Sequence, residues 1–430
     1  MANFTRRTFL TLSAATIAGA AGFYILTSKP KRKVVIIGGG AAGVIAAKYI
    51  RKADPNIAVT IVEQNQHYYT CFMSNEVLTG KRTIESIKFD YAKLKNYGIN
   101  IVYAQAIGID PDLHQVRLQD GTKLAYERLI VAPGISFNWD AINGYDATLV
   151  DKIPHAWKAG SQTLELQKQI QAMQDGDNVI ISVPPRPFRC PPGPYERASL
   201  IAQYLKRHKP KSKVLIFDSS SRFSKQKLFI QGWEQLYGYG TANSLIEWIP
   251  AKKGGKLVAV DAKAMAIYTG YSEDKHTAKV LNIIPPQQAG KIAIDSGLTD
   301  ASGWCPIKQM TFESSLQKDI YVIGDACVTG IMPKSAYSAN SQAKVCAQAV
   351  TASLRGVEMV EPSLVNTCYS IVGDEFGISV TAVYRVKNGK IKVSQGARGS
   401  SPLSASADYR KSEVAYAHSM YANITHEMFD

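Results

Sequence analysis

Residues 34–43 read Val-Val-Ile-Ile-Gly-Gly-Gly-Ala-Ala-Gly. The apolar run 34–37 predicts a buried parallel strand, and the glycines predict a tight turn into a helix over 44–50. A second predicted strand, 57–62, is followed by Glu63, about 20 residues after the last glycine. A strand, a glycine loop, a helix, a second strand and a terminal acid in this order are typical of a dinucleotide-binding unit.

The parts of this pattern have separate tasks in holding a dinucleotide. Gly38, Gly40 and Gly43 allow the backbone to approach a pyrophosphate at the positive N-terminus of the helix. Glu63 is placed to accept hydrogen bonds from the adenosine ribose. The glycine loop alone also fits an unrelated tight turn, but the complete order of elements favours a nucleotide-binding unit.

Two later strand ends indicate which dinucleotide is bound. Residues 126–134 predict a strand that ends in a turn containing Ala132 and Gly134, and residues 320–326 predict a strand ending at Asp325. These ends resemble the Ala-Thr-Gly and Gly-Asp motifs of the two-dinucleotide flavoprotein superfamily, with a proline in place of the threonine. In that superfamily the aspartate binds the flavin ribityl chain, so the resemblance implies FAD.

The segments divide the chain into four parts. We expect an α/β protein with two Rossmann-like dinucleotide-binding-type domains, glutathione-reductase-like, and a small C-terminal α+β domain. The parts are a signal segment, 1–28, a discontinuous FAD-binding domain, 30–145 and 285–355, a second Rossmann-like domain, 146–284, and a C-terminal domain, 356–430.

The second Rossmann-like domain repeats the plan but changes its loop. Predicted strands over 178–183 and 213–218 flank a predicted helix over 195–206. The loop 184–194 contains one glycine and several prolines, which lack the N–H donors that would hold a pyrophosphate. We therefore expect this domain to keep its architecture without binding a nicotinamide dinucleotide, and its loop to present Cys190 instead.

The C-terminal part has a pattern of its own. Residues 369–384 carry apolar and β-branched side chains and predict strand, whereas 389–406 are polar and rich in Gly and Ser and predict a loop. A helical stripe follows, and we expect it to pack on the body of the protein rather than on a membrane or a partner. The stripe consists of Val414, Ala417, Tyr421, Ile424 and Met428.

The first residues predict export. Arg6 and Arg7 precede a weakly hydrophobic, uncharged stretch over 9–26. This pattern is typical of a twin-arginine signal, which is cleaved and carries a folded, cofactor-loaded protein to the periplasm. The alternative is an uncleaved single anchor, because about 18 residues can nearly span a bilayer. After cleavage we expect no stable membrane span.

Composition excludes several classes of protein. The 430 residues are 46% hydrophobic and 20% charged, which excludes a disordered chain and a polytopic membrane protein. The net charge of +15 comes without a nucleic-acid-binding motif, so we expect no nucleic acid and an anionic substrate or acidic partner. The six cysteines form no Cys-x-x-Cys, which argues against a zinc ribbon and against haem on this chain.

Several longer motifs resemble the flavoprotein subunit of flavocytochrome c sulfide dehydrogenase, over essentially the whole chain after the signal. These runs are far more specific than the dinucleotide pattern. They are 68–76, Tyr-Tyr-Thr-Cys-Phe-Met-Ser-Asn-Glu; 188–198, around Cys190; 303–306, Gly-Trp-Cys-Pro; 333–342, with Ala336 where Gly is expected; and 366–370, Asn-Thr-Cys-Tyr-Ser.

This resemblance implies roles for three cysteines. Cys71 matches the residue that bonds to the flavin 8α carbon as a thioether. Cys190 and Cys368 match a redox pair that can form a disulfide beside the flavin. Without the resemblance, Cys71 would be read as a buried thiol and Cys190 as a surface thiol. We expect Cys327 and Cys346 to be buried apolar residues and assign Cys305 no role.

Three further residues are candidates for the site. Lys334 and Tyr337 lie in the run before a predicted helix whose positive N-terminus we expect to face the flavin and stabilise its reduced anion. Glu196 lies near the start of the helix after Cys190, where it is either a base for the cysteine or a carboxylate favoured by the helix dipole. Both readings of Glu196 stay open.

The resemblance also implies an activity and a partner. Hydrosulfide would attack the Cys190–Cys368 disulfide, and its sulfur would leave as elemental sulfur or polysulfide. The electrons would pass through the flavin to a separate c-type cytochrome subunit, with which this chain would form a heterodimer. The alternatives are a sulfide:quinone oxidoreductase, an NAD(P)H-dependent reductase and a non-catalytic flavin carrier. We assign no metal-ligating residues.

Overall fold

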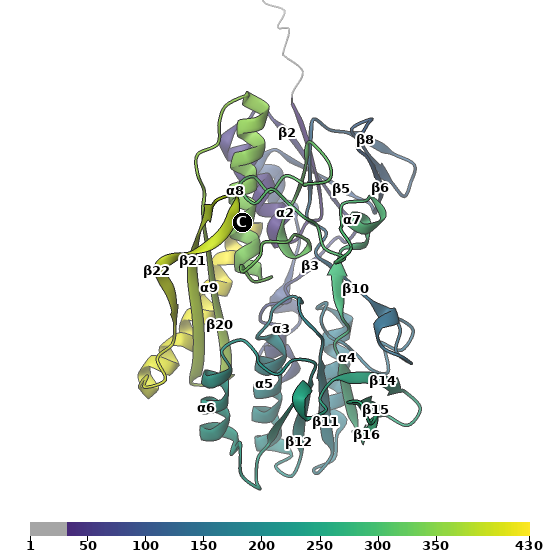
Figure 1. The fold of residues 1–430 in the computed structure, drawn as a ribbon, viewed down its shortest axis with the longest axis vertical. Helices are drawn as coiled ribbons and strands as arrows, with labels where there is room; N and C mark the ends of the chain where they lie inside the picture. The colour runs from purple at the N-terminus through teal and green to yellow at the C-terminus, as the bar shows by residue number, and fades with distance from the viewer. Residues whose placement is uncertain (1–31) are drawn as a thin grey trace, which may run out of the picture. The chain divides into compact units, whose positions relative to one another are not determined.

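The structure, a computed structural model, describes residues 32–430. The predicted signal, residues 1–28, lies outside the described residues. Two parallel sheets, each covered by helices, make up most of the described chain, and a three-stranded antiparallel sheet with a long helix follows them (Figure 1). This is the α/β architecture with a small C-terminal α+β domain that the sequence predicts.

The first sheet is parallel and has five strands. In register, Val35 lies beside Thr60 on one side and Leu129 on the other. Its strands are buried and rich in Val and Ile because helices pack against the sheet. In spatial order the strands are β19 (Ile320–Val322), β9 (Arg128–Val131), β1 (Lys33–Ile37), β2 (Ala58–Glu63) and β5 (Ile99–Tyr103).

Two helices that are far apart in sequence lie side by side on this sheet (Figure 1). They are α2 (Ala41–Ala53) and α8 (Ala336–Arg355). Gly43 lets α2 approach the strand before it, since a Cβ atom there would lie 1.9 Å from the carbonyl oxygen of Gly38. Gly38 itself has φ +102°, a backbone conformation that residues with a side chain rarely adopt.

The second parallel sheet has four strands in the order β13 (Ile246–Pro250), β12 (Lys213–Asp218), β11 (Asn178–Val183) and β17 (Val280–Ile283). The helices α5 (Gly193–His208) and α6 (Gln226–Tyr237) belong to this unit. Smaller strand groups complete the two units. They are β6 (Ala106–Asp110), β7 (Gln115–Leu118) and β8 (Lys123–Ala125); β14 (Leu257–Asp261), β15 (Ala266–Thr269) and β16 (Asp274–Thr277); and β10 (Ile135–Phe137) with β18 (Gln287–Ala289).

The C-terminal sheet corrects one prediction. It has three antiparallel strands, β20 (Ser363–Gly373), β21 (Phe376–Lys387) and β22 (Lys390–Ser400), whereas residues 389–406 were expected to be a loop. β22 is an edge strand that pairs only with β21 and is largely exposed. A polar sequence suits such a strand, because its backbone supplies the pairing and water meets its side chains.

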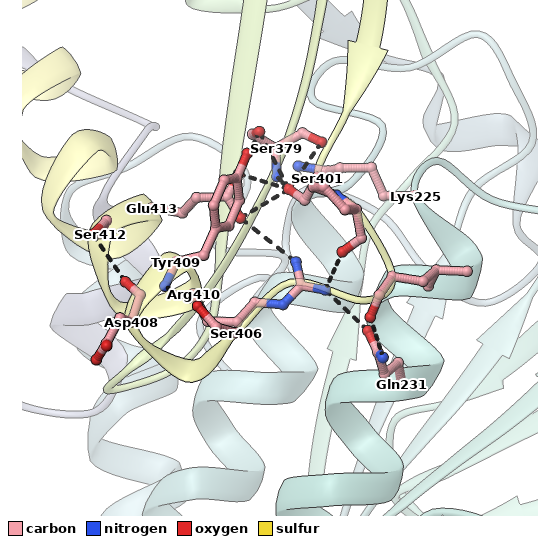
Figure 2. Close-up of polar contacts among 12 residues, drawn as sticks. Lys225, Gln231, Ser379, Ser401, Ser406, Asp408, Tyr409, Arg410, Ser412 and Glu413 are labelled. Carbon is pink, nitrogen blue, oxygen red and sulfur yellow. Dashed lines mark hydrogen bonds and ion pairs between the residues drawn. The ribbon is translucent and has the colours of Figure 1, made fainter.

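The last helix, α9 (Ala407–Phe429), packs on the body of the protein as predicted. All five residues of the predicted apolar stripe are buried. At its first turns, Arg410 and Glu413 form a buried ion pair, and Glu413 accepts hydrogen bonds from Ser379 and Ser401 (Figure 2). Among the helices of residues 32–430, none is long and apolar enough to cross a membrane.

Candidate active site

A cavity of about 670 Å³ lies where the carboxyl ends of the first sheet, the start of α5, strand β20 and helix α9 meet. Its wall includes eleven of the thirteen residues that the sequence analysis selected. They are Gly38, Gly40, Glu63, Cys71, Ala132, Gly134, Cys190, Glu196, Asp325, Tyr337 and Cys368.

The other two selected residues support this wall from behind. Gly43 keeps α2 close to the glycine loop. The ammonium group of Lys334 donates hydrogen bonds to the carbonyl oxygens of Asp325, at 2.7 Å, and Cys327, at 3.0 Å, and lies 3.7 Å from the centroid of the Trp304 ring. The side chain of Lys334 is therefore engaged with protein groups outside the cavity.

The glycine loop and Glu63 form one hydrogen-bonded unit. The backbone N–H of Gly39 donates to Oε2 of Glu63 over 2.7 Å, and the backbone N–H of Asn65 donates to Oε1 over 2.9 Å. The carboxylate thus ties the end of β2 to the loop after β1. The first turn of α2 contains no acidic residue, so its N-terminus can receive a pyrophosphate.

Asp325 fits the polar part of a dinucleotide. Its Oδ1 atom is buried in the described structure without a hydrogen-bond partner, although buried carboxylates are normally satisfied. Burial raises the pKa of this carboxyl, and the nearby charges of Arg189 and Lys334 oppose the rise. A flavin dinucleotide carries hydroxyl donors that would satisfy this oxygen, so the residues present fit FAD.

Cys71 lies beside a cationic side chain. Its Sγ atom is 3.6 Å from the carbonyl oxygen of Trp157, and the guanidinium group of Arg189 donates to the same oxygen. The thiol and the guanidinium are therefore neighbours at the cavity wall. The thiol is half-buried, which leaves it open to a ligand in the cavity.

Cys190 is held in an unusual backbone conformation. Its φ is +56°, in the left-handed region that non-glycine residues seldom adopt. Its N–H donates to the carbonyl oxygen of Lys334 over 2.8 Å, and its own carbonyl accepts from the N–H of Gly193 over 2.8 Å. These two bonds fix the loop before α5 and aim the half-buried thiol at the cavity.

Cys368, on β20, reaches the same cavity although 177 residues separate it from Cys190 in the chain. Burial raises the pKa of the Cys190 thiol, and the neighbouring Cys368 and Glu196 raise it further. Both cysteines line the same cavity. All six cysteines are free thiols in the described structure, so a disulfide between this pair stays a prediction. Cys305, Cys327 and Cys346 are fully buried, which confirms the expectation for the last two.

Glu196 joins three elements at the start of α5. Its Oε1 atom accepts from the N–H of Ile371 on β20 over 2.8 Å, and its Oε2 atom accepts from Nδ2 of Asn75 over 3.0 Å. Asn75 belongs to α3 (Ser74–Leu78). Burial raises the pKa of Glu196 against these hydrogen bonds and the charge of Lys225. Both oxygens have positioning contacts, and the two readings of Glu196 stay predictions.

Sequence reasoning missed three charged residues near this site. Arg197 is buried, stacks 5.0 Å from the Trp157 ring centroid and donates to the carbonyl oxygens of His155 and Ala156. The ammonium group of Lys225 donates to the backbone carbonyl oxygen of Cys368, and nothing in the local sequence around Lys225 predicts this contact. Arg189 directly precedes Cys190, and that adjacency was the one available signal.

Two positions of the second Rossmann-like unit have features that disfavour a dinucleotide, as the sequence predicts. Glu196 puts a negative charge in the first turn of α5, where a pyrophosphate would lie. At the end of β12, Oδ2 of Asp218 already accepts from the hydroxyl of Tyr195 over 2.7 Å and Nε1 of Trp248 over 2.9 Å. This acid is fully buried and cannot reach a ribose.

Family models match three parts of the chain. Residues 163–285 match the central domain of the flavoprotein chain of sulfide dehydrogenase (flavocytochrome c), and residues 360–429 match the flavin-binding domain of flavocytochrome c sulphide dehydrogenase. Residues 32–179 match the pyridine nucleotide-disulphide oxidoreductases.

Two curated relatives share low sequence identity with the chain. The chain is 25% identical over 305 residues to a sulfide-quinone reductase of Aquifex aeolicus, covering 68% of this chain and 67% of that enzyme. It is 21% identical over 277 residues to the mitochondrial sulfide:quinone oxidoreductase of Mus musculus, covering 62% of this chain and 59% of the mouse enzyme.

Solved structures share the fold. The sulfide:quinone oxidoreductase structure from Aquifex aeolicus superposes with a TM-score of 0.72 at 17% identity, over 92% of each chain. A putidaredoxin reductase, solved in covalent complex with putidaredoxin, gives 0.64 at 16% identity, over 91% of this chain and 94% of that one. With both sulfide dehydrogenase models matched behind an N-terminal oxidoreductase domain, the chain belongs to the flavocytochrome c sulfide dehydrogenase flavoprotein family.

Proposed function

We propose that this chain oxidises sulfide to elemental sulfur or polysulfide with FAD and the Cys190–Cys368 pair. One observation carries the proposal. Two thiols from distant parts of the sequence line the same cavity as the glycine loop and Asp325. The match to both sulfide dehydrogenase models and the similarity to sulfide:quinone oxidoreductases support the same substrate.

The chemistry begins on the cysteines. In the oxidised pair, hydrosulfide attacks one sulfur, the S–S bond breaks, and a persulfide forms on that cysteine while the other becomes a thiolate. FAD, when bound, supplies a two-electron acceptor that can release electrons one at a time. The net charge of +15 and the nearby Arg189 and Lys225 favour entry of an anion. We further propose that Cys71 bonds FAD covalently.

For the acceptor we propose a separate c-type cytochrome subunit, with this chain as the flavoprotein of a heterodimer. The family models for 163–285 and 360–429 support this choice over quinone. The sequence pattern of residues 1–28 supports export to the periplasm by the twin-arginine route. Quinone remains the second candidate, because the curated relatives above are named for it.

Anaerobic titration with sulfide tests the activity. The flavin absorbance near 450 nm should bleach on mixing, and Cys190→Ser and Cys368→Ser should keep the flavin spectrum but lose the bleaching. Oxidised cytochrome c or a soluble quinone is then added to the reduced protein. Rapid oxidation of the reduced flavin by cytochrome c would support the proposed acceptor. Oxidation by quinone but not by cytochrome c would show that quinone is the acceptor. A wild-type flavin that sulfide does not bleach would show a passive carrier.

A further inference from the structure

Lys225 connects the second Rossmann-like unit to the strand that carries Cys368. It stands directly before α6 with φ +59°, and its side chain lies next to the strands of the C-terminal sheet (Figure 2). Its Nζ atom donates to the carbonyl oxygen of Cys368 over 3.0 Å and to Oγ of Ser370 over 2.8 Å. The ammonium group therefore holds β20 at the cysteine and at the residue two positions later.

The contacts leave part of the ammonium group free. A lysine has three N–H donors, and two of them are used on β20. Within residues 32–430, the third donor has no hydrogen-bond acceptor. A half-buried cation with a spare donor, bonded to the backbone of the residue that carries a thiol, is suited to balance a negative charge that appears on that sulfur.

The charges around the cysteine pair come from three elements. Glu196 on α5 adds a negative charge that raises the pKa of both thiols, and Lys225 before α6 opposes this at both. Arg189, in the loop before α5, opposes it at Cys190. At Cys368, burial is the largest cause of the raised pKa, and Lys225 is the largest charge effect against it. Lys225 therefore opposes the rise at both thiols, and of the two cysteines its ammonium group is hydrogen-bonded to Cys368.

We propose that Lys225 is a positioning residue of the cysteine pair: its ammonium group fixes the backbone at Cys368 and stabilises negative charge on the sulfur of Cys368 when the pair is reduced. This inference rests on the proposed function for its purpose, because a redox pair needs one sulfur that accepts the electron pair of the broken S–S bond. No proton transfer by Lys225 is required, since the lysine stays charged throughout.

The test measures the Cys368 thiol directly, without sulfide. The flavin-loaded protein is reduced anaerobically and desalted, then alkylated with iodoacetamide between pH 6 and 10, and mass spectrometry follows each cysteine separately. Thiolates react and thiols do not, so the rate reports the pKa of Cys368. Lys225→Met should raise that pKa by about one unit and slow alkylation of Cys368 about tenfold near neutral pH.

Three further variants separate charge from structure. Lys225→Arg should keep the wild-type rate, whereas Lys225→Gln, which can still donate to β20, should slow alkylation as Lys225→Met does. Lys227→Met is the matched control, because Lys227 is an exposed lysine two residues along the same segment, and it should leave the rate unchanged. If Lys225→Met does not fold, Lys225→Gln and Lys225→Arg decide alone.

An unchanged pH profile in Lys225→Gln would overturn the inference. An equal change in Lys227→Met would also overturn it, because the effect would then belong to the general charge of the protein. Bleaching of the wild-type flavin by sulfide is measured on the same preparation. Its failure would remove the proposed function while leaving the result on the thiol readable.

Discussion

His155 is a buried histidine whose ring accepts a hydrogen bond at Nδ1 from the backbone N–H of Trp157 over 3.0 Å. Burial, together with the positive charges of Lys158, Arg197 and Arg189, lowers its pKa to about 3. The unfolded chain binds a proton at this residue near pH 6.5, and the folded chain does not until about pH 3. The stability that this histidine provides is therefore present above pH 6.5 and is lost as the pH falls.

We expect the His155 contribution to fall by about 2 kcal/mol between pH 7 and pH 5. His155→Asn removes the titrating group, so its free energy of unfolding should vary less between these two pH values than that of the wild type. Urea unfolding at both values measures this. His208→Asn, at an exposed histidine, is the control and should keep the wild-type difference. Identical pH dependence in wild type and His155→Asn would contradict the assignment.

Cys71 carries the prediction about the cofactor bond. Cys71→Ala should still bind FAD, because the glycine loop, Glu63 and Asp325 are unchanged, but all of the flavin should be released by acid. In the wild type, the flavin should stay on the denatured protein and fluoresce with its band on a gel. Full release from flavin-loaded wild type would show that the bond does not form. Cys346→Ala, at a buried cysteine outside the cavity wall, serves as the comparison.

At the scale of elements, α9 begins at an ion pair that water does not reach. Arg410 and Glu413 are 4% and 3% exposed, and their charged atoms are 3.6 Å apart. Removal of one partner leaves the other charge buried without a counter-charge. Glu413→Ala should therefore cost about 3–5 kcal/mol of stability, measured by thermal or urea unfolding.

The same helix offers a matched comparison. The charged atoms of Lys411 and Glu375 are 2.6 Å apart, but both side chains are largely exposed, so Lys411→Ala should change the stability far less than Glu413→Ala does. A small effect of Glu413→Ala, similar to that of Lys411→Ala, would show that water enters the first turns of α9.

The elements differ in how well they can be predicted from their own sequences. Strand β1 and helix α2 were predictable because apolar residues and glycines there follow from burial and from a close backbone approach. Strand β22 was not, because an edge strand is specified by pairing with a neighbour and needs no apolar pattern of its own. The polar run of residues 389–406 was consequently assigned to a loop.

At the scale of the whole molecule, the second Rossmann-like unit carries a prediction about which donors can reduce the flavin. Glu196 occupies the first turn of α5, and Asp218 is hydrogen-bonded to Tyr195 and Trp248. We therefore expect NADH to reduce the flavin far more slowly than sulfide does, as stopped-flow absorbance would show. Reduction by NADH at a rate comparable to that by sulfide would refute this interpretation of the unit.

The candidate site could be predicted only in part, because some of its residues come from distant parts of the chain. Glycine loops and strand ends are local patterns, so Gly38, Glu63 and Asp325 were found from nearby residues. The pairing of Cys190 with Cys368 came from family resemblance, since no local pattern joins residues so far apart. Lys225 depends on how α6 meets β20, and a single sequence does not encode that contact in any short motif.

Lys334 connects Asp325 with the loop of Cys190. Its ammonium group holds the carbonyl oxygen of Asp325, and its own carbonyl oxygen holds the N–H of Cys190. Asp325 and the loop of Cys190 are therefore joined through one residue. One lysine thus serves the aspartate with its side chain and the cysteine loop with its backbone, so damage at this single position would reach both groups at once.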